Sequence, residues 1–518
     1  MLTKVLRIAL CIALIFSAMV SFAQQDKKIY FRAQLLEYDE AIEPDVEHYT
    51  GNVIFRHQKT IGYCDQADHN RRTNRLEAHG DPVIVVISDS VKLYGQYVIY
   101  DAETRTVSIH EKVILKDKTA TLHVDSLFYD LNSDIAYYVH GGRMTSDGNV
   151  LTSEIGQYHT KTKMAYLYDS VKLVNDSYVA NCDKASFNTQ NETVYFLSRT
   201  HLVSDDNEIF TDRGWYDTKN DVTLIAGEAE LFNKEQSLTG DSLYYDKANK
   251  FGQGWNNVRL VDSVKNYILQ GNYIEFKEDD YADVTDSSLL VLIDHEDSLF
   301  LHADTLHMTF DSTSNPKEMY AYNHVKFYRE DMQGACDSMT YLVEDSLITM
   351  YFNPVVWSGE NQLTADTIIF RTIDSLNMDL ELHRSAFVAS SLFKETEFNQ
   401  VKGLSIVGRI HDQKLTRVDV EGNAECLYYI LEEDSSLIGI NSAITSEMTI
   451  VLEDNEIKTI TFYNNPDGKL YPDKDLAKED RLLKDFKWMN PYRPKVMADI
   501  YINPVARPKN ETQEEETE

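Results

Sequence analysis

Residues 122–130 read LHVDSLFYD, and the pattern of this stretch decides the fold of the 518-residue chain. Leu127 and Tyr129 alternate with more polar positions, which is the period of a strand with one apolar face. The pair Val124-Asp125 breaks the alternation, so we expect a corner or bulge at this point. Similar stretches recur along most of the sequence.

A large side chain, which we call the anchor, occupies the position of Tyr129 in every repeat. Successive anchors lie 29 to 33 residues apart, and each follows a small or valine residue by five positions and an acidic or amide residue by four. A fixed period of this length indicates stacked units that bury one continuous core. The anchors are Tyr38, His69, Tyr100, Tyr129, Tyr158, Phe187, Tyr216, Tyr245, Phe276, Met308, Tyr341 and Phe370.

A second turn signal lies between successive anchors, as in Gly51-Asn52-Val53 and Asp169-Ser170-Val171. We expect each of these to begin another short apolar strand. Short strands rich in Tyr, Val and Leu, with turns every 8–12 residues, are typical of all-β proteins. No helical period of ten residues appears inside the repeats, so the sequence predicts an all-β repeat protein.

The ends of the chain differ from the repeats. Residues 1–23 have the features of a signal peptide: basic residues, an apolar stretch and the small-x-small pattern Ser21-Phe22-Ala23. We therefore expect an exported, periplasmic protein that associates with the outer membrane.

The repeats occupy residues 24–470, and they are regular over 28–400 and degenerate over 401–470. Residues 471–518 are expected to form a capping segment and a disordered acidic tail. The cap would be a short amphipathic helix near residues 475–489, lying over the exposed edge of the last strands.

Charge and cysteine usage exclude some classes of protein. The net charge is −34, from 50 basic and 84 acidic residues, and phosphate contacts need clustered Lys and Arg, so nucleic acid is an improbable partner. Cys64, Cys182 and Cys336 share one repeat column, and the closest two are five repeats, roughly 24 Å, apart, beyond disulfide reach. The pattern leaves Cys426 undecided.

The sequence contains no catalytic constellation, phosphate-binding loop or metal-ligand spacing, so we expect no enzyme activity, no cofactor and no metal. The aspartates before the anchors could bind calcium, but hydrogen bonds to corner amides are the simpler interpretation. Triplets such as Asp125-Ser126-Leu127 and Asp241-Ser242-Leu243 are similar to an O-glycosylation sequon of some Gram-negative groups. Corner chemistry of the repeat explains them equally well.

These repeats, with their Tyr-Asp pairs, Gly-Asn-Val turns and export signal, resemble the organic-solvent-tolerance (OstA-like) family over about residues 28–470. That family includes LptA and the soluble N-terminal part of LptD. The resemblance implies an elongated β-jellyroll, or β-taco solenoid, with repeats of 29–33 residues and a short helical C-terminal cap. Such modules have a V-shaped apolar groove that shields the acyl chains of lipid A, and they stack end to end.

The resemblance therefore implies a non-enzymatic protein of lipopolysaccharide transport and outer-membrane assembly. Its implied partners are lipopolysaccharide, through lipid A, other OstA-like jellyrolls bound end to end by β-augmentation, and an outer-membrane LptD-like barrel. The residues expected to line the lipid groove are Tyr38, Tyr100, Leu127, Tyr129, Tyr158, Phe187, Tyr216, Leu243, Tyr245, Phe276, Tyr341 and Phe370.

Two alternatives remain open at this point. A closed β-solenoid could act as a scaffold or interaction protein of the cell envelope without any lipid cargo. A polysaccharide lyase on a β-helix would need His, Lys, Arg or Tyr clustered on neighbouring repeats, and no such cluster is evident. An open groove or a packed interior distinguishes the first alternative from a lipid conduit.

Overall fold

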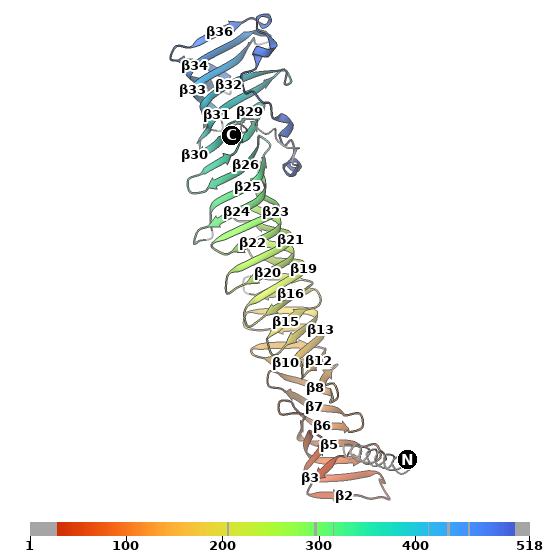
Figure 1. The fold of residues 1–518 in the computed structure, drawn as a ribbon. Helices are drawn as coiled ribbons and strands as arrows, with labels where there is room; N and C mark the ends of the chain where they lie inside the picture. Colours follow the sequence, from red (N-terminus) through yellow and green to blue (C-terminus); the bar gives the residue numbers. More distant parts are fainter. Residues whose placement is uncertain are drawn as a thin grey trace, which may run out of the picture. The chain divides into compact units, whose positions relative to one another are not determined.

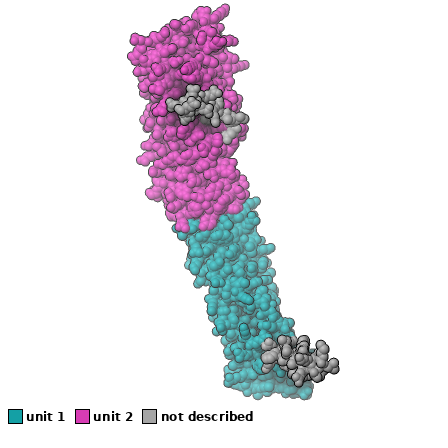
Figure 2. Space-filling model, in the orientation of Figure 1, with its two compact units in different colours: residues 1–234, 246–248 teal, residues 235–245, 249–518 magenta. Residues whose placement is uncertain are grey.

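Strands and tight turns make up nearly all of the chain from residue 30 to residue 471, which confirms the all-β class (Figure 1). The structure is a computed structural model, and it describes residues 28–502 except 205–206, 295–297, 314, 413, 433–435 and 454–455. The expected signal peptide and the acidic tail after residue 502 lie outside the described residues. The chain divides into two compact units, which the repeat pattern does not predict (Figure 2).

Unit 1 comprises residues 1–234 and 246–248. Its strands are β1 (Tyr30–Arg32), β2 (Leu35–Glu37), β3 (Val46–His57), β4 (Thr60–Asn70), β5 (Arg75–Val86), β6 (Lys92–Asp101), β7 (Thr106–Lys116), β8 (Thr121–Asp130), β9 (Ile135–Tyr138), β10 (Gly142–Ser146), β11 (Asn149–Ser153), β12 (Ile155–His159), β13 (Met164–Val174), β14 (Tyr178–Asn188), β15 (Thr193–Phe196), β16 (Thr200–Ser204), β17 (Glu208–Thr211), β18 (Arg213–Asp217) and β19 (Val222–Phe232).

Unit 2 comprises residues 235–245 and 249–518. Its strands are β20 (Gln236–Asp246), β21 (Phe251–Asp262), β22 (Tyr267–Lys277), β23 (Tyr281–Leu292), β24 (Leu299–Phe310), β25 (Pro316–Tyr328), β26 (Met332–Leu342), β27 (Leu347–Tyr351), β28 (Val355–Ser358), β29 (Asn361–Thr364), β30 (Thr367–Thr372), β31 (Asn377–Leu392), β32 (Glu397–His411), β33 (Lys414–Leu431), β34 (Leu437–Glu453), β35 (Glu456–Tyr463) and β36 (Asp467–Tyr471). Four 3₁₀ helices follow: η1 (Asp473–Asp475), η2 (Lys478–Arg481), η3 (Asn490–Tyr492) and η4 (Met497–Tyr501).

Each full-length strand bends once, at a β-bulge that we call the corner. Between β3 and β4, for example, Thr50 faces Gln66 and Val53 faces Cys64, so Gly51 and Asn52 oppose the single residue between the partners. Gly51 and Asn52 have φ angles of +83° and +47°, in the left-handed region. Two such residues against one is the definition of a bulge, and it turns the strand sharply.

The same corner recurs in both units. Consecutive left-handed pairs stand opposite an acidic or amide residue in most cases, as Glu111-Lys112 does opposite Asp125 and Asp169-Ser170 opposite Asp183. The prediction that the small-acidic pair forms a corner is therefore confirmed. The second turn signal was expected to begin a separate strand, but in β7 and β13 it lies inside one continuous strand, because the bulge bends the ladder without ending it.

The corner divides every repeat into two arms. The anchor arm carries the anchor, and the turns that follow the anchors form what we call the anchor lip. The second arm lies on the other side of the corner, and its connecting turns, such as residues 87–91 and 117–120, form the second lip. In parts of unit 1 the arms are separate strands, as in β9 and β10 on either side of Gly141.

Backbone hydrogen bonds connect successive turns of the anchor lip. The N–H of the residue two positions after an anchor donates to the carbonyl five positions after the previous anchor: Thr160 to Asp134 at 3.0 Å, Thr189 to Lys163 at 2.9 Å. The accepting residue has a positive φ, 56° for Asp134 and 63° for Lys163, which directs its carbonyl toward the next turn. We call these bonds turn staples, and they hold the repeat spacing.

The C-terminal segment contains short helices, as expected, but they are 3₁₀ helices of three to five residues rather than one amphipathic helix. The segment 472–502, which we call the strap, also lies along the outer face of unit 2 instead of covering only its last strands. Leu476 packs near the end of unit 2 against Tyr429 and Ile440. Further on, the strap reaches β23, where Ile500 packs against Leu289.

Buried glutamines of unit 2 bind the strap through its backbone. The carboxamide of Gln400 accepts from Leu483 N and donates to Arg481 O, both at 2.8 Å. The carboxamide of Gln362 accepts from Met489 N at 2.6 Å and donates to Lys487 O at 2.7 Å. Since neighbouring residues of a strand face opposite sides, these glutamines lie on the outer face of the second arm.

We expect the substitution Gln362→Ala to loosen the strap. It leaves the N–H of Met489 and the carbonyl of Lys487 buried without their partner, at a cost of about 1–3 kcal/mol for each group. Hydrogen exchange at the Met489 amide should accelerate, and the urea midpoint of unit 2 should fall. Gln270→Ala, at an exposed position of β22, is the matched control and should change neither quantity. Unchanged exchange at Met489 would contradict the assignment.

Candidate functional site

The interior between the two arms is the candidate functional site. In unit 1, one apolar cluster extends from Val53 to Leu202 and receives side chains from every repeat in between. Its members come from both arms: Leu122 and Val124 from the second arm, and Leu127 and Tyr129 from the anchor arm, all on one strand. The alternation on each side of the corner therefore directs both arms of β8 to the same interior.

The predicted groove residues lie mostly inside. Exposed fractions are 0–1% for Tyr100, Leu127, Tyr129, Tyr158 and Phe187, and 5–7% for Leu243 and Phe370. Tyr216, Tyr245, Phe276 and Tyr341 are half-buried. Tyr38 is 41% exposed, and its ring lies under the guanidinium of Arg71, 4.5 Å from the ring centroid. Unit 1 thus brings its five most buried candidates into one core, and Tyr38 lies apart from them.

Hydroxyl groups of the interior tyrosines are hydrogen-bonded where they reach the lips. Tyr100 OH lies 2.5 Å from His57 Nδ1 on the second lip, and Tyr129 OH lies 2.8 Å from Thr160 Oγ1 on the anchor lip. Burial raises the pKa of both Tyr100 and Tyr129 to about 12. These phenols are therefore neutral at physiological pH, and each fixes its ring by one polar contact.

Polar side chains of the two lips meet across the mouth of unit 1. The buried carboxylate of Asp117, on the second lip, accepts from Tyr158 OH at 2.8 Å and from Lys163 Nζ at 2.5 Å. Thr119 Oγ1 lies 2.7 Å from Thr189 Oγ1, and Asn149 Nδ2 donates to Thr218 Oγ1 at 3.3 Å. The interior of unit 1 is therefore closed along this part of its mouth.

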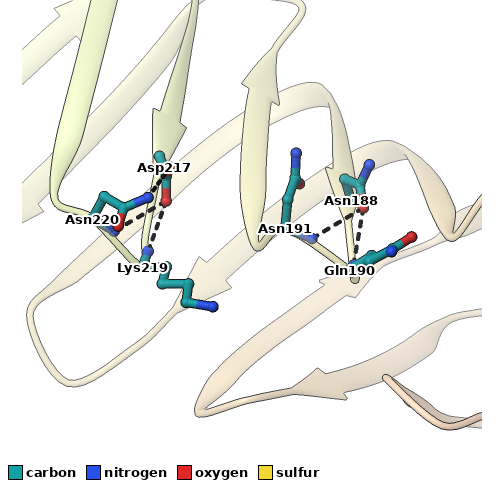
Figure 3. A pocket seen from close by; sticks show the side chains of 6 residues that line it. All are labelled: Asn188, Gln190, Asn191, Asp217, Lys219 and Asn220. Atoms are coloured by element: carbon teal, nitrogen blue, oxygen red, sulfur yellow. Dashed lines mark hydrogen bonds between the residues drawn. The ribbon is translucent and has the colours of Figure 1, made fainter.

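A polar hollow of about 650 Å³ lies outside the mouth, between two turns of the anchor lip (Figure 3). Asn188 and Asp217, each directly after an anchor, accept backbone N–H bonds from their own turns, such as Lys219 N to Asp217 Oδ1 at 3.0 Å. Because its lining is made of amides, a carboxylate and Lys219, the hollow does not suit acyl chains.

The corner aspartates bind nearby side chains. Asp212 accepts from Arg199 at 3.2 Å, and Asp304 lies 2.8 Å from His324 Nδ1 in the left-handed pair that faces it. Among the described residues, no group of three or more His, Cys, Asp or Glu side chains is arranged to hold a metal ion. Within the same part of the chain, no helix is long and apolar enough to cross a membrane.

The four described cysteines are free thiols, as the column spacing predicted for Cys64, Cys182 and Cys336. The structure also settles Cys426, which is buried and unpaired with another cysteine. Burial raises the pKa of the Cys64 thiol to about 12 and that of Cys426 to about 11, so both are protonated and unreactive at neutral pH.

Two known families match consecutive parts of the chain. The family described as OstA-like protein matches residues 25–181 and 176–281. The family described as LptA/(LptD N-terminal domain) LPS transport protein matches residues 295–375. The chain belongs to the OstA-like family.

The OstA-like chain also matches a solved structure, LptH, the LptA homologous periplasmic component of the lipopolysaccharide transport device from Pseudomonas aeruginosa. The two are 17% identical over 20% of this chain and 79% of LptH, with a TM-score of 0.19. A comparison with curated proteins found no match.

Sequence reasoning missed the residues that close the mouth of this OstA-like protein. Asp117 and Thr119 lie in turns of the second lip, whose length varies from repeat to repeat, so they fall in no repeat column. Thr160, Thr189 and Thr218, in contrast, lie two positions after successive anchors, and this column was available as a signal. Their partners could not be deduced because the cross-mouth contacts join residues 41 to 70 positions apart.

We expect the OstA-like protein to lose stability between about pH 10 and pH 12. Free tyrosine ionises near pH 10, whereas Tyr100 and Tyr129 ionise near 12 in the folded chain, so between these values only the unfolded state releases their protons. Each of the two tyrosines then contributes a loss of about 1.4 kcal/mol per pH unit. Urea unfolding from pH 8 to pH 12, with tyrosinate absorbance recorded in parallel, measures the effect. Tyr129→Phe should reduce the slope, and an equal slope in both proteins would contradict the prediction.

Proposed function

We propose that this chain is a non-enzymatic, periplasmic protein of lipopolysaccharide transport and outer-membrane assembly, and that its interior shields the acyl chains of lipid A. The observation that carries the proposal is the continuous apolar interior of unit 1, from Val53 to Leu202, in a chain of the OstA-like family. An interior shared by successive repeats has no polar step along its length. A lipid could therefore move along it without crossing a barrier at each repeat.

Acyl chains would replace side-chain contacts that are already apolar. Every CH₂ group moved from water into such an interior gains about 0.8 kcal/mol. The anchors occupy the interior of unit 1 in this structure, with Tyr158 and Phe187 0% exposed, so lipid binding requires the arms to part. The lipid-accepting state is then an opened form of the same fold, in which the acyl chains lie against Leu127, Tyr129 and Phe187.

Exposed strand edges support partners that bind by β-augmentation. In unit 1, β1 and β2 pair only with β3 within the described part of the chain, and Tyr30, Leu35 and Leu36 on them are 51–55% exposed. In unit 2, β36 pairs with β34 through one edge, and Leu470 is 58% exposed. Unpaired strand edges with apolar side chains suit another OstA-like jellyroll or the N-terminal part of an LptD-like barrel protein.

A scaffold without lipid cargo is the second candidate function. The fully packed interior and hydrogen-bonded mouth of unit 1 favour it, because a groove that never opens only stabilises the stack. The two functions differ in one observable property, which is the access of lipid to the inward side chains.

We expect a photoreactive phenylalanine at Tyr129, Phe187 or Tyr245 to form lipopolysaccharide adducts in cells. These side chains face the interior, whereas Ser126 and Ser242 lie three residues before their anchors on the opposite face of the strand, and the same replacement there should give none. The adducts are identified by immunoblotting with an antibody against lipopolysaccharide, and each variant must first be shown to be exported and folded.

Lipid adducts at inward positions alone would support the conduit. A complete lack of adducts at all three inward positions, in folded and exported protein, would exclude it and leave the scaffold function. Equal adducts at inward and outward positions would indicate nonspecific contact and would also count against a shielded interior.

A further inference from the structure

The residues along the mouth of unit 1 change in character from one end to the other. Over the earlier repeats the lips contribute apolar side chains, namely Ile87 and Val91 from the second lip and Ala102 and Leu131 from the anchor lip, all less than 10% exposed. From Asp117 onward the lips contribute polar side chains instead. We call this part the polar seam; its members are Asp117, Thr119, Asn149, Lys163, Thr189 and Thr218.

The strongest contact of the polar seam is an ion pair. The side chain of Asp117 is 0% exposed and that of Lys163 is 19% exposed, and Asp117 Oδ2 lies 2.5 Å from Lys163 Nζ. Tyr158 OH donates to the same oxygen at 2.8 Å and also lies 3.3 Å from Thr189 Oγ1. One turn of the second lip is thus bound to two successive turns of the anchor lip.

Parting the lips has different costs in the two parts of the mouth. Where the lips are apolar, parting exposes Ile87, Val91 and Leu131 to water with no compensating interaction. In the polar seam, each group that loses a protein partner gains hydration, and a buried ion pair is separated with little net cost because both charges recover their solvation. The polar seam is therefore the part of the mouth where opening costs least.

We propose that the polar seam is the gate of unit 1: the arms part there, and the acyl chains of a lipid pass between the lips at residues 117–120 and 158–189. This inference rests on the proposed function, since it names the place at which the same interior takes up its lipid. Once the Asp117–Lys163 pair separates, water hydrates both charges and the threonine hydroxyls. The turn staples hold the spacing of the anchor-lip turns meanwhile, because they lie within one lip.

A disulfide across the seam tests the gate directly. Thr119 and Thr189 have hydroxyl oxygens 2.7 Å apart, so Thr119→Cys with Thr189→Cys places two thiols in position to bond. The full-length variant also carries a photoreactive phenylalanine at Phe187. We expect lipopolysaccharide adducts at Phe187 to disappear in the oxidised protein and to return after reduction. The single variant Thr119→Cys, oxidised in the same way, should keep its adducts.

The position of passage is tested with probes on the outside of the second lip. A photoreactive phenylalanine at Lys118 lies in the seam turn, and one at Asp89 lies in the turn of the apolar mouth; both positions are exposed. Passage through the seam predicts lipid adducts at Lys118 and none at Asp89. Adducts at Asp89 equal to those at Lys118 would overturn the proposal.

A third measurement needs no lipid. We expect Asp117→Asn to accelerate hydrogen exchange at the amides of Thr160 and Thr189 by about tenfold or more, because Lys163 then lacks its charged partner. Tyr138→Phe is the matched control: it removes a buried hydroxyl bond of 2.7 Å to Ser153 at the corner, away from the mouth. Exchange that responds equally to both variants would mean general destabilisation and not a gate.

The outcomes separate the two proposals. Adducts at Phe187 that persist in the oxidised disulfide variant would overturn the gate and leave the proposed function intact. Absence of adducts in the reduced and oxidised proteins alike would instead count against the proposed function. In that case the exchange measurement alone decides whether the polar seam opens.

Discussion

The corner bulge is the constraint on which the rest of this structure depends. Two residues with positive φ stand opposite one, as Glu111 and Lys112 stand opposite Asp125, and the extra residue reverses which side chains face inward. Without the bulge, a strand that buries Leu122 and Val124 would direct Leu127 and Tyr129 to solvent. With it, both arms bury their apolar residues in one interior, and the strand bends enough to enclose that interior.

The lips follow from the corner because bent strands bring their two ends toward the same side of the interior. In unit 1 this places turns from distant repeats close together, and polar contacts such as Asp117 with Lys163 become possible. The same geometry explains why the anchors are so often tyrosine. Their rings fill the interior, and their hydroxyls reach the lips, where His57 and Thr160 accept or donate a hydrogen bond.

Much of the fold was available from the sequence because each repeat column has a local cause. Small residues such as Cys64 mark the corner because space there is limited, and alternation correctly assigned Leu127 and Tyr129 to the interior. The turn signals were found, but their pairing with the corner aspartates was not, since it joins neighbouring strands. The strap was predicted as a cap on the last strands; its course depends on Gln362 and Gln400, which fall outside every column. Which candidate residues meet lipid stays a prediction, because burial alone does not distinguish a core from a closed groove.

The turn staples have a consequence for how a protein of this kind can change its length. Each staple joins positions 26 residues apart, as from Asp134 to Thr160, and the next staple repeats the same offset from Lys163 to Thr189. An insertion of a few residues between two anchors shifts the donor away from its carbonyl and changes which side chains face inward. Gain or loss of a whole repeat preserves every donor, acceptor and inward position on either side of it. Duplication and deletion in whole repeats are therefore the changes in length that this architecture tolerates, and its reach would evolve in discrete steps of one repeat.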